Sequence, residues 1–268
     1  MSFDEAKHAR ERDGKFTHKP HAEAVGVNLD APVIVEGRQE WQLPDGTLHR
    51  EGGPARIWED GSQEWFWHGA LHRDGGLPAV IHSDGTKEWW EHGRLHRAGD
   101  LPALVHADGT QTWVKDNQVH RAGDLPAVIR GDGTKEWYDH GQPHRDNDLP
   151  AVVKGDGTQT WIERGLVHRD NDLPAIITAD GVQAWVRHGK PHRDSGPAIT
   201  HPDGSQEWWQ NGGLHRLRGP ALAHADCRQE WWQHGKRHRA SGPAVIHPNG
   251  TKQWWVRGRQ QQPPNQKE

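Results

Sequence analysis

The dipeptide His-Arg occurs nine times along this chain of 268 residues and is its most evident chemical feature. A row of arginines can hold phosphates or carboxylates through paired N–H groups, and neighbouring tryptophan rings offer faces on which flat groups stack. The same pattern also fits a structural role, in which each arginine pairs with a glutamate across a strand pair and each histidine packs on a tryptophan. The copies are His49-Arg50, His72-Arg73, His96-Arg97, His120-Arg121, His144-Arg145, His168-Arg169, His192-Arg193, His215-Arg216 and His238-Arg239.

The expected strand pairing divides these arginines into two groups. Five are expected to face a glutamate, in the pairs Arg73/Glu64, Arg97/Glu88, Arg145/Glu136, Arg216/Glu207 and Arg239/Glu230. Three are expected to face Thr112, Thr160 and Ala184, and because these lack a carboxylate we predict that they bind the ligand: Arg121, Arg169 and Arg193. Asp170 and Asp194 lie next to two of them in the sequence and are alternative partners.

Tryptophans recur at spacings of 24 or 23 residues, and this period indicates a repeat architecture. The ten are Trp41, Trp65, Trp89, Trp113, Trp137, Trp161, Trp185, Trp208, Trp231 and Trp254. We expect them to form the stabilising core of the repeats, because each indole buries a large area in units that have few aliphatic residues. A second tryptophan follows directly in the last three repeats, and we expect Trp209, Trp232 and Trp255 to form an exposed patch that binds a partner.

Histidine pairs four residues apart, such as His92 and His96, resemble a metal-binding pattern on a helix. Here the spacing crosses an expected turn, which separates the two rings, so no metal site is predicted. The repeats also offer no distinctive nucleophile, glycine-rich phosphate loop or acid pair. We therefore expect no catalytic residues, no cofactor and no enzymatic activity.

The elements that position these residues follow from one unit, LPAVIHSDGTKEWWEHGRLHRAG at Leu77–Gly99. Asp84-Gly85 is typical of a two-residue type I′ hairpin loop, which would place Ile81 opposite Glu88 and Val80 opposite Trp89. A second turn is expected at His92-Gly93, with Trp90 opposite Leu95 and Trp89 opposite His96. Asn117 replaces glycine at this second turn in one repeat, which indicates a left-handed backbone position.

These signals predict an all-β fold, an elongated twisted antiparallel meander of about nine to ten β-hairpin repeats of 23 or 24 residues. A β-solenoid, which would add one coil per repeat, is the structural alternative. We divide the chain into a flexible polar arm at 1–26, a tryptophan-rich β-repeat domain at 27–258 and a disordered tail at 259–268.

The stretch DGTKEWWEHGRLH and its copies resemble MORN repeats, in which an aromatic-rich β-hairpin combines a DG or NG turn with a Gly-x-x-His element. The resemblance covers about four-fifths of the chain. MORN units usually continue with glycine after that histidine, whereas this chain has arginine followed by LPA or GPA. The resemblance implies phosphoinositide binding, membrane tethering or protein scaffolding as expected functions.

The charge balance restricts the partners. Lys and Arg number 33 against 37 Asp and Glu, which gives a net charge of −4 and no global field that attracts nucleic acid or an anionic membrane. No apolar run is long enough for a transmembrane segment, no signal peptide is evident, and a single cysteine fits a reducing compartment. We expect a cytoplasmic scaffold for multivalent protein–protein interaction, and as the alternative an anion, nucleic-acid or phosphoinositide binder that uses the His-Arg and tryptophan rows.

Overall fold

The computed structural model describes residues 31–263, and every regular element in that range is a β-strand. The predicted arm at 1–26, the first four residues of the predicted repeat domain and residues 264–268 lie outside the described residues. At the C-terminal end the sheet continues three residues past the predicted boundary, because Arg259–Gln261 pairs with the strand before it.

The predicted meander is confirmed by one open antiparallel sheet of 21 strands, in which each strand pairs with the sheet strands that precede and follow it in the sequence. The repeats therefore add two strands each. The strands are β1 (Val33–Val35), β2 (Arg38–Glu40), β3 (Arg56–Ile57), β4 (Gln63–Glu64), β7 (Val80–Ile81), β8 (Lys87–Glu88), β11 (Leu104–Val105), β12 (Gln111–Thr112), β15 (Val128–Ile129), β16 (Lys135–Glu136), β19 (Val152–Val153), β20 (Gln159–Thr160), β23 (Ile176–Ile177), β24 (Gln183–Ala184), β27 (Ile199–Thr200), β28 (Gln206–Glu207), β31 (Leu222–Ala223), β32 (Gln229–Glu230), β35 (Val245–Ile246), β36 (Lys252–Val256) and β37 (Arg259–Gln261).

A second row of short hairpins accompanies this sheet. Each hairpin follows the repeat's core tryptophan, which separates it from the preceding strand of the large sheet, as Trp89 separates β9 from β8. The pairs are β5 (Phe66–Trp67) with β6 (Ala70–Leu71), β9 (Trp90–Glu91) with β10 (Arg94–Leu95), β13 (Val114–Lys115) with β14 (Gln118–Val119), β17 (Tyr138–Asp139) with β18 (Gln142–Pro143), β21 (Ile162–Glu163) with β22 (Leu166–Val167), β25 (Val186–Arg187) with β26 (Lys190–Pro191), β29 (Trp209–Gln210) with β30 (Gly213–Leu214), and β33 (Trp232–Gln233) with β34 (Lys236–Arg237).

The register predicted at the Asp-Gly turn is wrong by one residue. Val80 pairs with Glu88 and Ile81 with Lys87. A type I′ turn needs positive φ at both central residues, but in this turn only Gly85 has it, at 91°. The amide of Gly85 donates to the carbonyl of His82 at 3.0 Å, which makes a three-residue loop in which glycine forms the bulge.

The register predicted at the second turn is confirmed for the pairs next to the turn. Glu91 pairs with Arg94 and Trp90 with Leu95, and both turn residues, His92 and Gly93, have positive φ. Asn117, which replaces the glycine in one repeat, also has a positive φ, of 64°. This turn is therefore the two-residue type I′ loop.

The core is built mainly from one alanine and one tryptophan per repeat, and valines such as Val80 and Val245 are also buried. The amide of Ala79 donates to Glu88 and the amide of Trp89 donates to Ala103 of the next repeat, both at 2.8 Å, so these residues join consecutive strands. The alanines have no exposed surface: Ala55, Ala79, Ala103, Ala127, Ala151, Ala175, Ala198, Ala221 and Ala244. Six tryptophans are only 5–8 % exposed: Trp41, Trp89, Trp113, Trp137, Trp161 and Trp185.

Two further rows of hydrogen bonds link neighbouring repeats. In the second-row hairpins the turn glycine donates its amide to a carbonyl of the preceding hairpin, as Gly93 does to Leu71 at 2.9 Å. At the Asp-Gly turns a backbone amide donates to a hydroxyl of the preceding turn, as Gly155 does to Thr134 Oγ1 at 3.3 Å. Each repeat is thus bonded to its neighbours along its sheet strands and both turns.

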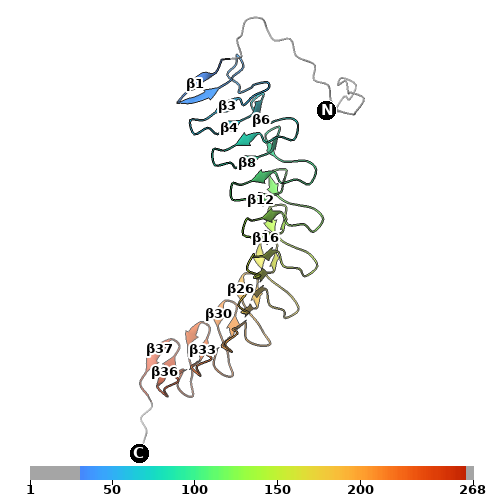
Figure 1. Cartoon of the computed structure of the whole chain (residues 1–268). Helices are drawn as coiled ribbons and strands as arrows, with labels where there is room; N and C mark the ends of the chain where they lie inside the picture. The colour runs from blue at the N-terminus through green and yellow to red at the C-terminus, as the bar shows by residue number, and fades with distance from the viewer. Residues whose placement is uncertain (1–30, 264–268) are drawn as a thin grey trace, which may run out of the picture.

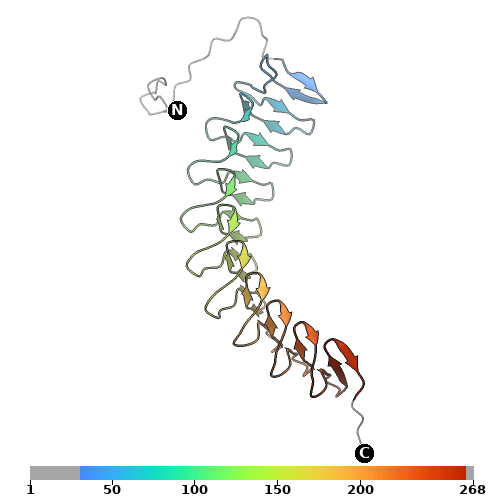
Figure 2. The same cartoon turned by 180° about the vertical axis from the view of Figure 1, so that it is seen from behind.

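The described chain is an extended, curved rod with β1 and β37 at opposite ends (Figures 1 and 2). Its repeats follow one another in sequence order along the rod. Equivalent residues of successive repeats therefore form rows that run along the molecule.

Candidate functional site

All nine arginines of the His-Arg dipeptides lie over the core tryptophan of their own repeat. The guanidinium carbon is 3.7–3.9 Å from the ring centroid in each pair, which is within the range of a cation–π interaction. Each Nη1 also donates to the carbonyl of the proline four or five residues later, at 3.1–3.4 Å. We call this unit of arginine, tryptophan and proline carbonyl the arginine clamp.

Four clamps also receive an aspartate from the preceding repeat. Arg121 donates Nε and Nη2 to the two carboxylate oxygens of Asp100, at 2.8 and 2.9 Å. The same bidentate pair recurs three times, as Arg145/Asp124, Arg169/Asp148 and Arg193/Asp172. The four arginine side chains are only 13–20 % exposed.

The expectation that Arg121, Arg169 and Arg193 lack a carboxylate partner is therefore wrong. Their partners, at 21 positions earlier in the chain, come from the preceding loop and not from the residues after them. Asp170 and Asp194, the alternatives considered, accept instead from His168 and His192. The ligand-binding role of the three arginines stays a prediction.

The arginine clamp affects the ionisation of its aspartate. Hydrogen bonds from Arg121, Arg145 and Arg169 lower the pKa of Asp100, Asp124 and Asp148 respectively. In the fourth pair, hydrogen bonds from Arg193 and then from Ser195 lower the pKa of Asp172 to about 2. These carboxylates are charged at neutral pH and neutralise the four guanidinium groups.

The predicted glutamate–arginine pairs are not formed. Glu88 lies between Val80 and Leu104 in the sheet, and its carboxylate accepts from His82 Nε2 at 2.9 Å and from Trp90 Nε1 at 2.7 Å. The interruption of the strand at the tryptophan separates the glutamate from the arginine of the second hairpin. Glu64, Glu136, Glu207 and Glu230 likewise bond to other cationic or aromatic side chains.

The predicted tryptophan patch lies on the last second-row hairpins and on β36. Trp209, Trp232 and Trp255 are half-buried, and each indole Nε1 donates to the side chain two residues earlier, a glutamate or a glutamine. The guanidinium of Arg237 lies 5.1 Å from the ring of Trp232 and 5.4 Å from that of Trp255. The structure therefore brings these two rings together around one cation, and the patch's role as a partner site stays a prediction.

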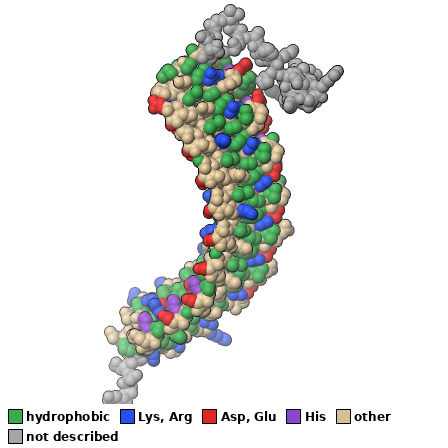
Figure 3. All heavy atoms as spheres, in the orientation of Figure 1, with side chains coloured by type: hydrophobic (Ala, Val, Ile, Leu, Met, Phe, Trp, Pro, Cys, Tyr) green, Lys and Arg blue, Asp and Glu red, His purple; other side chains and the backbone are tan. Residues whose placement is uncertain are grey.

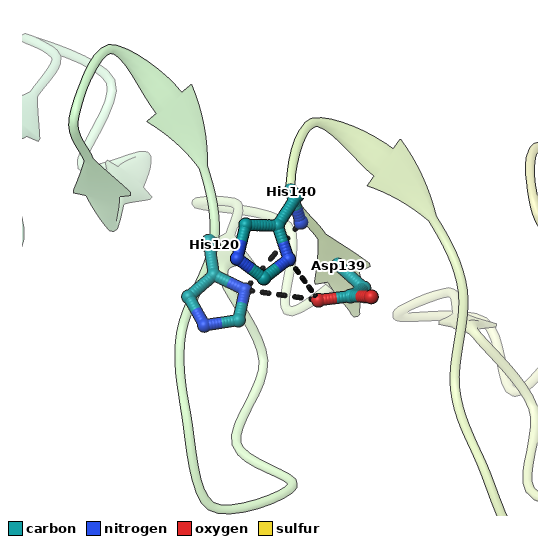
Figure 4. A group of neighbouring side chains, drawn as sticks. All are labelled: His120, Asp139 and His140. Carbon is teal, nitrogen blue, oxygen red and sulfur yellow. Dashed lines mark hydrogen bonds and ion pairs between the residues drawn. The ribbon is translucent and has the colours of Figure 1, made fainter.

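Histidines gather between repeats, as Figure 4 shows for His120, Asp139 and His140. Asp139 Oδ1 lies 2.6 Å from His140 Nδ1 and 3.4 Å from His120 Nδ1, so the three groups have the composition of a metal site. However, His120 Nδ1 also accepts the backbone amide of His140. Six other histidines make the same bond to the next repeat, which identifies it as a structural link: His49, His72, His144, His192, His215 and His238.

A row of exposed leucines is the feature that the sequence reasoning missed. Each belongs to the Leu-Pro-Ala segment of a long loop, and the row consists of Leu77, Leu101, Leu125, Leu149 and Leu173, which are 37–50 % exposed. The constant spacing of 24 residues was the available signal.

Lys and Arg side chains recur at intervals along a largely apolar face of the rod (Figure 3).

The described part of the chain contains no helix with the length and apolarity that crossing a membrane requires. No protein-family model matches the chain, and a search of curated proteins finds no match.

Proposed function

We propose that the protein is a non-enzymatic scaffold that binds protein partners along its repeats. The observation that carries the proposal is the leucine row, Leu77 to Leu173, in which an exposed apolar side chain occurs once in each of five consecutive repeats. Two strands at about 4.8 Å each place successive leucines about 10 Å apart. Exposed apolar groups that form a continuous series are typical of protein interaction surfaces.

Two further features support this proposal. The half-buried indoles of Trp209, Trp232 and Trp255 give a second group of partly exposed apolar side chains toward the C-terminal end of the rod. The resemblance to MORN repeats, carried by the Gly-x-x-His hairpins such as Gly93–His96, is consistent with a scaffold, and we propose that the chain is a divergent MORN-like protein.

Affinity capture from native lysate tests the leucine row. The full chain is compared with the triple variant Leu101→Ser, Leu125→Ser, Leu149→Ser, which we expect to lose its specifically bound proteins. The control is a second triple variant, Ile34→Ser, Leu166→Ser, Val256→Ser, which removes exposed apolar side chains outside the row. Equal capture by the two folded variants would contradict the proposal.

Anion or nucleic-acid binding is the second function considered, through Arg121, Arg169 and Arg193. In each of these arginines an aspartate already occupies Nε and Nη2, so a phosphate would have to displace a carboxylate. This observation favours the protein scaffold. Anisotropy of a labelled single-stranded oligonucleotide at 50 and 200 mM salt, and flotation with phosphoinositide liposomes, should show no saturable binding; a steep salt dependence would support the alternative.

A further inference from the structure

One long loop departs from the acid-bearing pattern of its neighbours. In five repeats the proline lies five positions after the clamp arginine, and in four of these loops the third residue after the arginine is Asp100, Asp124, Asp148 or Asp172. The fifth loop, Arg73–Pro78, has Gly76 at that place. The arginine that would receive this missing carboxylate is Arg97.

Arg97 otherwise has the surroundings of Arg121. Its guanidinium lies 3.8 Å from the ring centroid of Trp89, and its Nη1 donates to the carbonyl of Pro102 at 3.3 Å. Trp89 Nε1 donates to the carbonyl of Gly76 at 2.8 Å, as Trp113 Nε1 does to that of Asp100 at 3.0 Å. The backbone of Gly76 is therefore held in the same relation to the clamp as the backbone of Asp100.

The missing carboxylate leaves a polar atom without a partner. Among the described residues, Arg97 is the only clamp arginine whose Nε is buried and has no hydrogen bond. A Cβ added at Gly76 would meet no atom within 4 Å, so the space that an aspartate side chain occupies in the next four repeats is open here. A buried guanidinium N–H without an acceptor is unfavourable, and an external carboxylate would satisfy it.

The open space is part of a surface pocket of about 170 Å³ between the loops at 72–77 and 96–98. Asp74 and Glu91 also line this pocket and would repel an anion. The clamp of Arg169 shows that this repulsion is tolerated. Asp146 and Glu163 hold the equivalent positions there, and Asp148 still forms its bidentate pair with Arg169.

We propose that this pocket receives one carboxylate from an aspartate or glutamate side chain of a protein partner, and that Arg97 binds it as Arg121 binds Asp100. The chemistry is carboxylate binding, because the four equivalent sites hold planar carboxylates in a two-point geometry. Leu77, half exposed at the rim of the pocket, supplies an apolar contact beside the charge. The partner as the source of the carboxylate rests on the scaffold function proposed above.

Nuclear magnetic resonance of the full chain, labelled with ¹⁵N at the arginine Nε, tests the site with sodium acetate as the probe and sodium chloride as the ionic-strength control. We expect a saturable downfield shift of the Arg97 Nε–H resonance with acetate alone. The Arg121 resonance serves as the internal reference and should not move, because Asp100 already occupies it. An Arg97 resonance that moves no more than that of Arg121 would overturn the proposal.

The variant Gly76→Asp makes the test specific. Gly76 has a φ of 67°, and the four aspartates of the other long loops have φ values of 52–55°, so aspartate is compatible with this backbone. The variant should abolish the acetate response of Arg97. The charge-matched control Gly123→Asp lies two repeats away and should retain it. A response that persists in Gly76→Asp, or a response to inorganic phosphate without one to acetate, would overturn the assignment.

This experiment and the capture experiment fail independently. If Arg97 of the unaltered chain does not respond to acetate, the proposed carboxylate site is ruled out, and the proposal for the leucine row is unaffected. Failure of the leucine variants to change protein capture would remove the scaffold function, whereas the binding of acetate at Arg97 would still be measured.

Discussion

At the scale of single residues, the arginine clamps use interactions that only arginine offers together, two in every clamp and three in four of them. The planar guanidinium stacks on an indole, Nη1 bonds to a proline carbonyl, and in four repeats Nε and Nη2 bond to an aspartate. Lysine has a charge of the same sign but neither the planar face nor the fork of donors. The conservation of this geometry across nine repeats of one molecule indicates that the arginine row is first of all part of the structure.

Replacing Arg145 by lysine should therefore destabilise the fold by about 1–2 kcal/mol, because the stacking and the bidentate bond are both lost. Urea unfolding followed by circular dichroism measures the change. Arg94→Lys is the control, since the Arg94 side chain is 68 % exposed and should change stability by less than about 0.5 kcal/mol. Equal effects of the two substitutions would show that the clamp contributes nothing beyond surface charge.

The pair of Arg193 and Asp172 should contribute a stability that depends on pH. The pKa of Asp172 is about 2 in the folded protein and near 3.8 in the unfolded chain, so the unfolded state takes up the proton first as the pH falls. The stabilisation is complete above pH 3.8 and is lost between pH 3.8 and 2. Because Asp172 is half exposed, we expect about 0.2–1 kcal/mol.

Thermal or urea unfolding of the protein and of Asp172→Asn from pH 7 to pH 2 measures this difference. The original chain should be the more stable at neutral pH, and the two curves should converge near pH 2. Ser195 also bonds to Asp172, so Ser195→Ala should raise the folded pKa of Asp172 and narrow this pH range, by less than the removal of the arginine does. A stability gap that stays constant down to pH 2 would contradict the ion-pair account.

At the scale of the elements, the turns were predictable to different degrees. The second turn, with its paired positive-φ residues such as His92 and Gly93, has the chemistry of a type I′ loop, and its register follows from the sequence. The dipeptide Asp-Gly is common to two-residue and three-residue loops, so Asp84-Gly85 did not determine the register. One residue of difference exchanged the faces of this strand pair. The predicted glutamate–arginine pairs were wrong for another reason, because the strand is interrupted at Trp89, which separates Glu88 from Arg97.

The candidate site was less predictable than the fold because its partners come from other repeats. The bond of Arg121 to Asp100 spans 21 residues and passes between two loops, where no strand periodicity links the partners. Gly76 can be recognised as an exception only from the structure, in which the four equivalent aspartates each occupy the space beside a clamp arginine. Trp137 and its equivalents, in contrast, were predictable as core residues from their spacing alone.

The Asp-Gly turns also join the repeats to one another, and this link should contribute to stability. Thr134 is buried, and its Oγ1 accepts the amide of Gly155 in the next repeat at 3.3 Å. Thr134→Val keeps the shape and removes the acceptor, so we expect a loss of about 1 kcal/mol in the free energy of unfolding. Thr251→Val, in the last turn, is exposed and should be near neutral. Similar losses in both variants would contradict a link between turns.

At the scale of the whole molecule, every described repeat bonds to its neighbours in sequence, and the sheet remains open from β1 to β37. Stability in such a protein is approximately the sum of repeat and neighbour terms, so the surface can lengthen with each repeat without a larger core. The leucine row and the clamps are consequences of this arrangement, because equivalent residues fall on lines along the rod. The proposed scaffold function depends on that length.

Small-angle X-ray scattering of the full chain in solution tests this claim most directly. Twenty steps of about 4.8 Å along the 21-stranded sheet give a rod of about 95 Å, which corresponds to a radius of gyration of about 25 Å or more. A compact protein of the same length would have a radius of gyration of about 18 Å. We predict the extended radius of gyration together with a distance distribution that is skewed to long distances. A radius of gyration near 18 Å with a symmetric distance distribution would contradict the stacked-repeat structure.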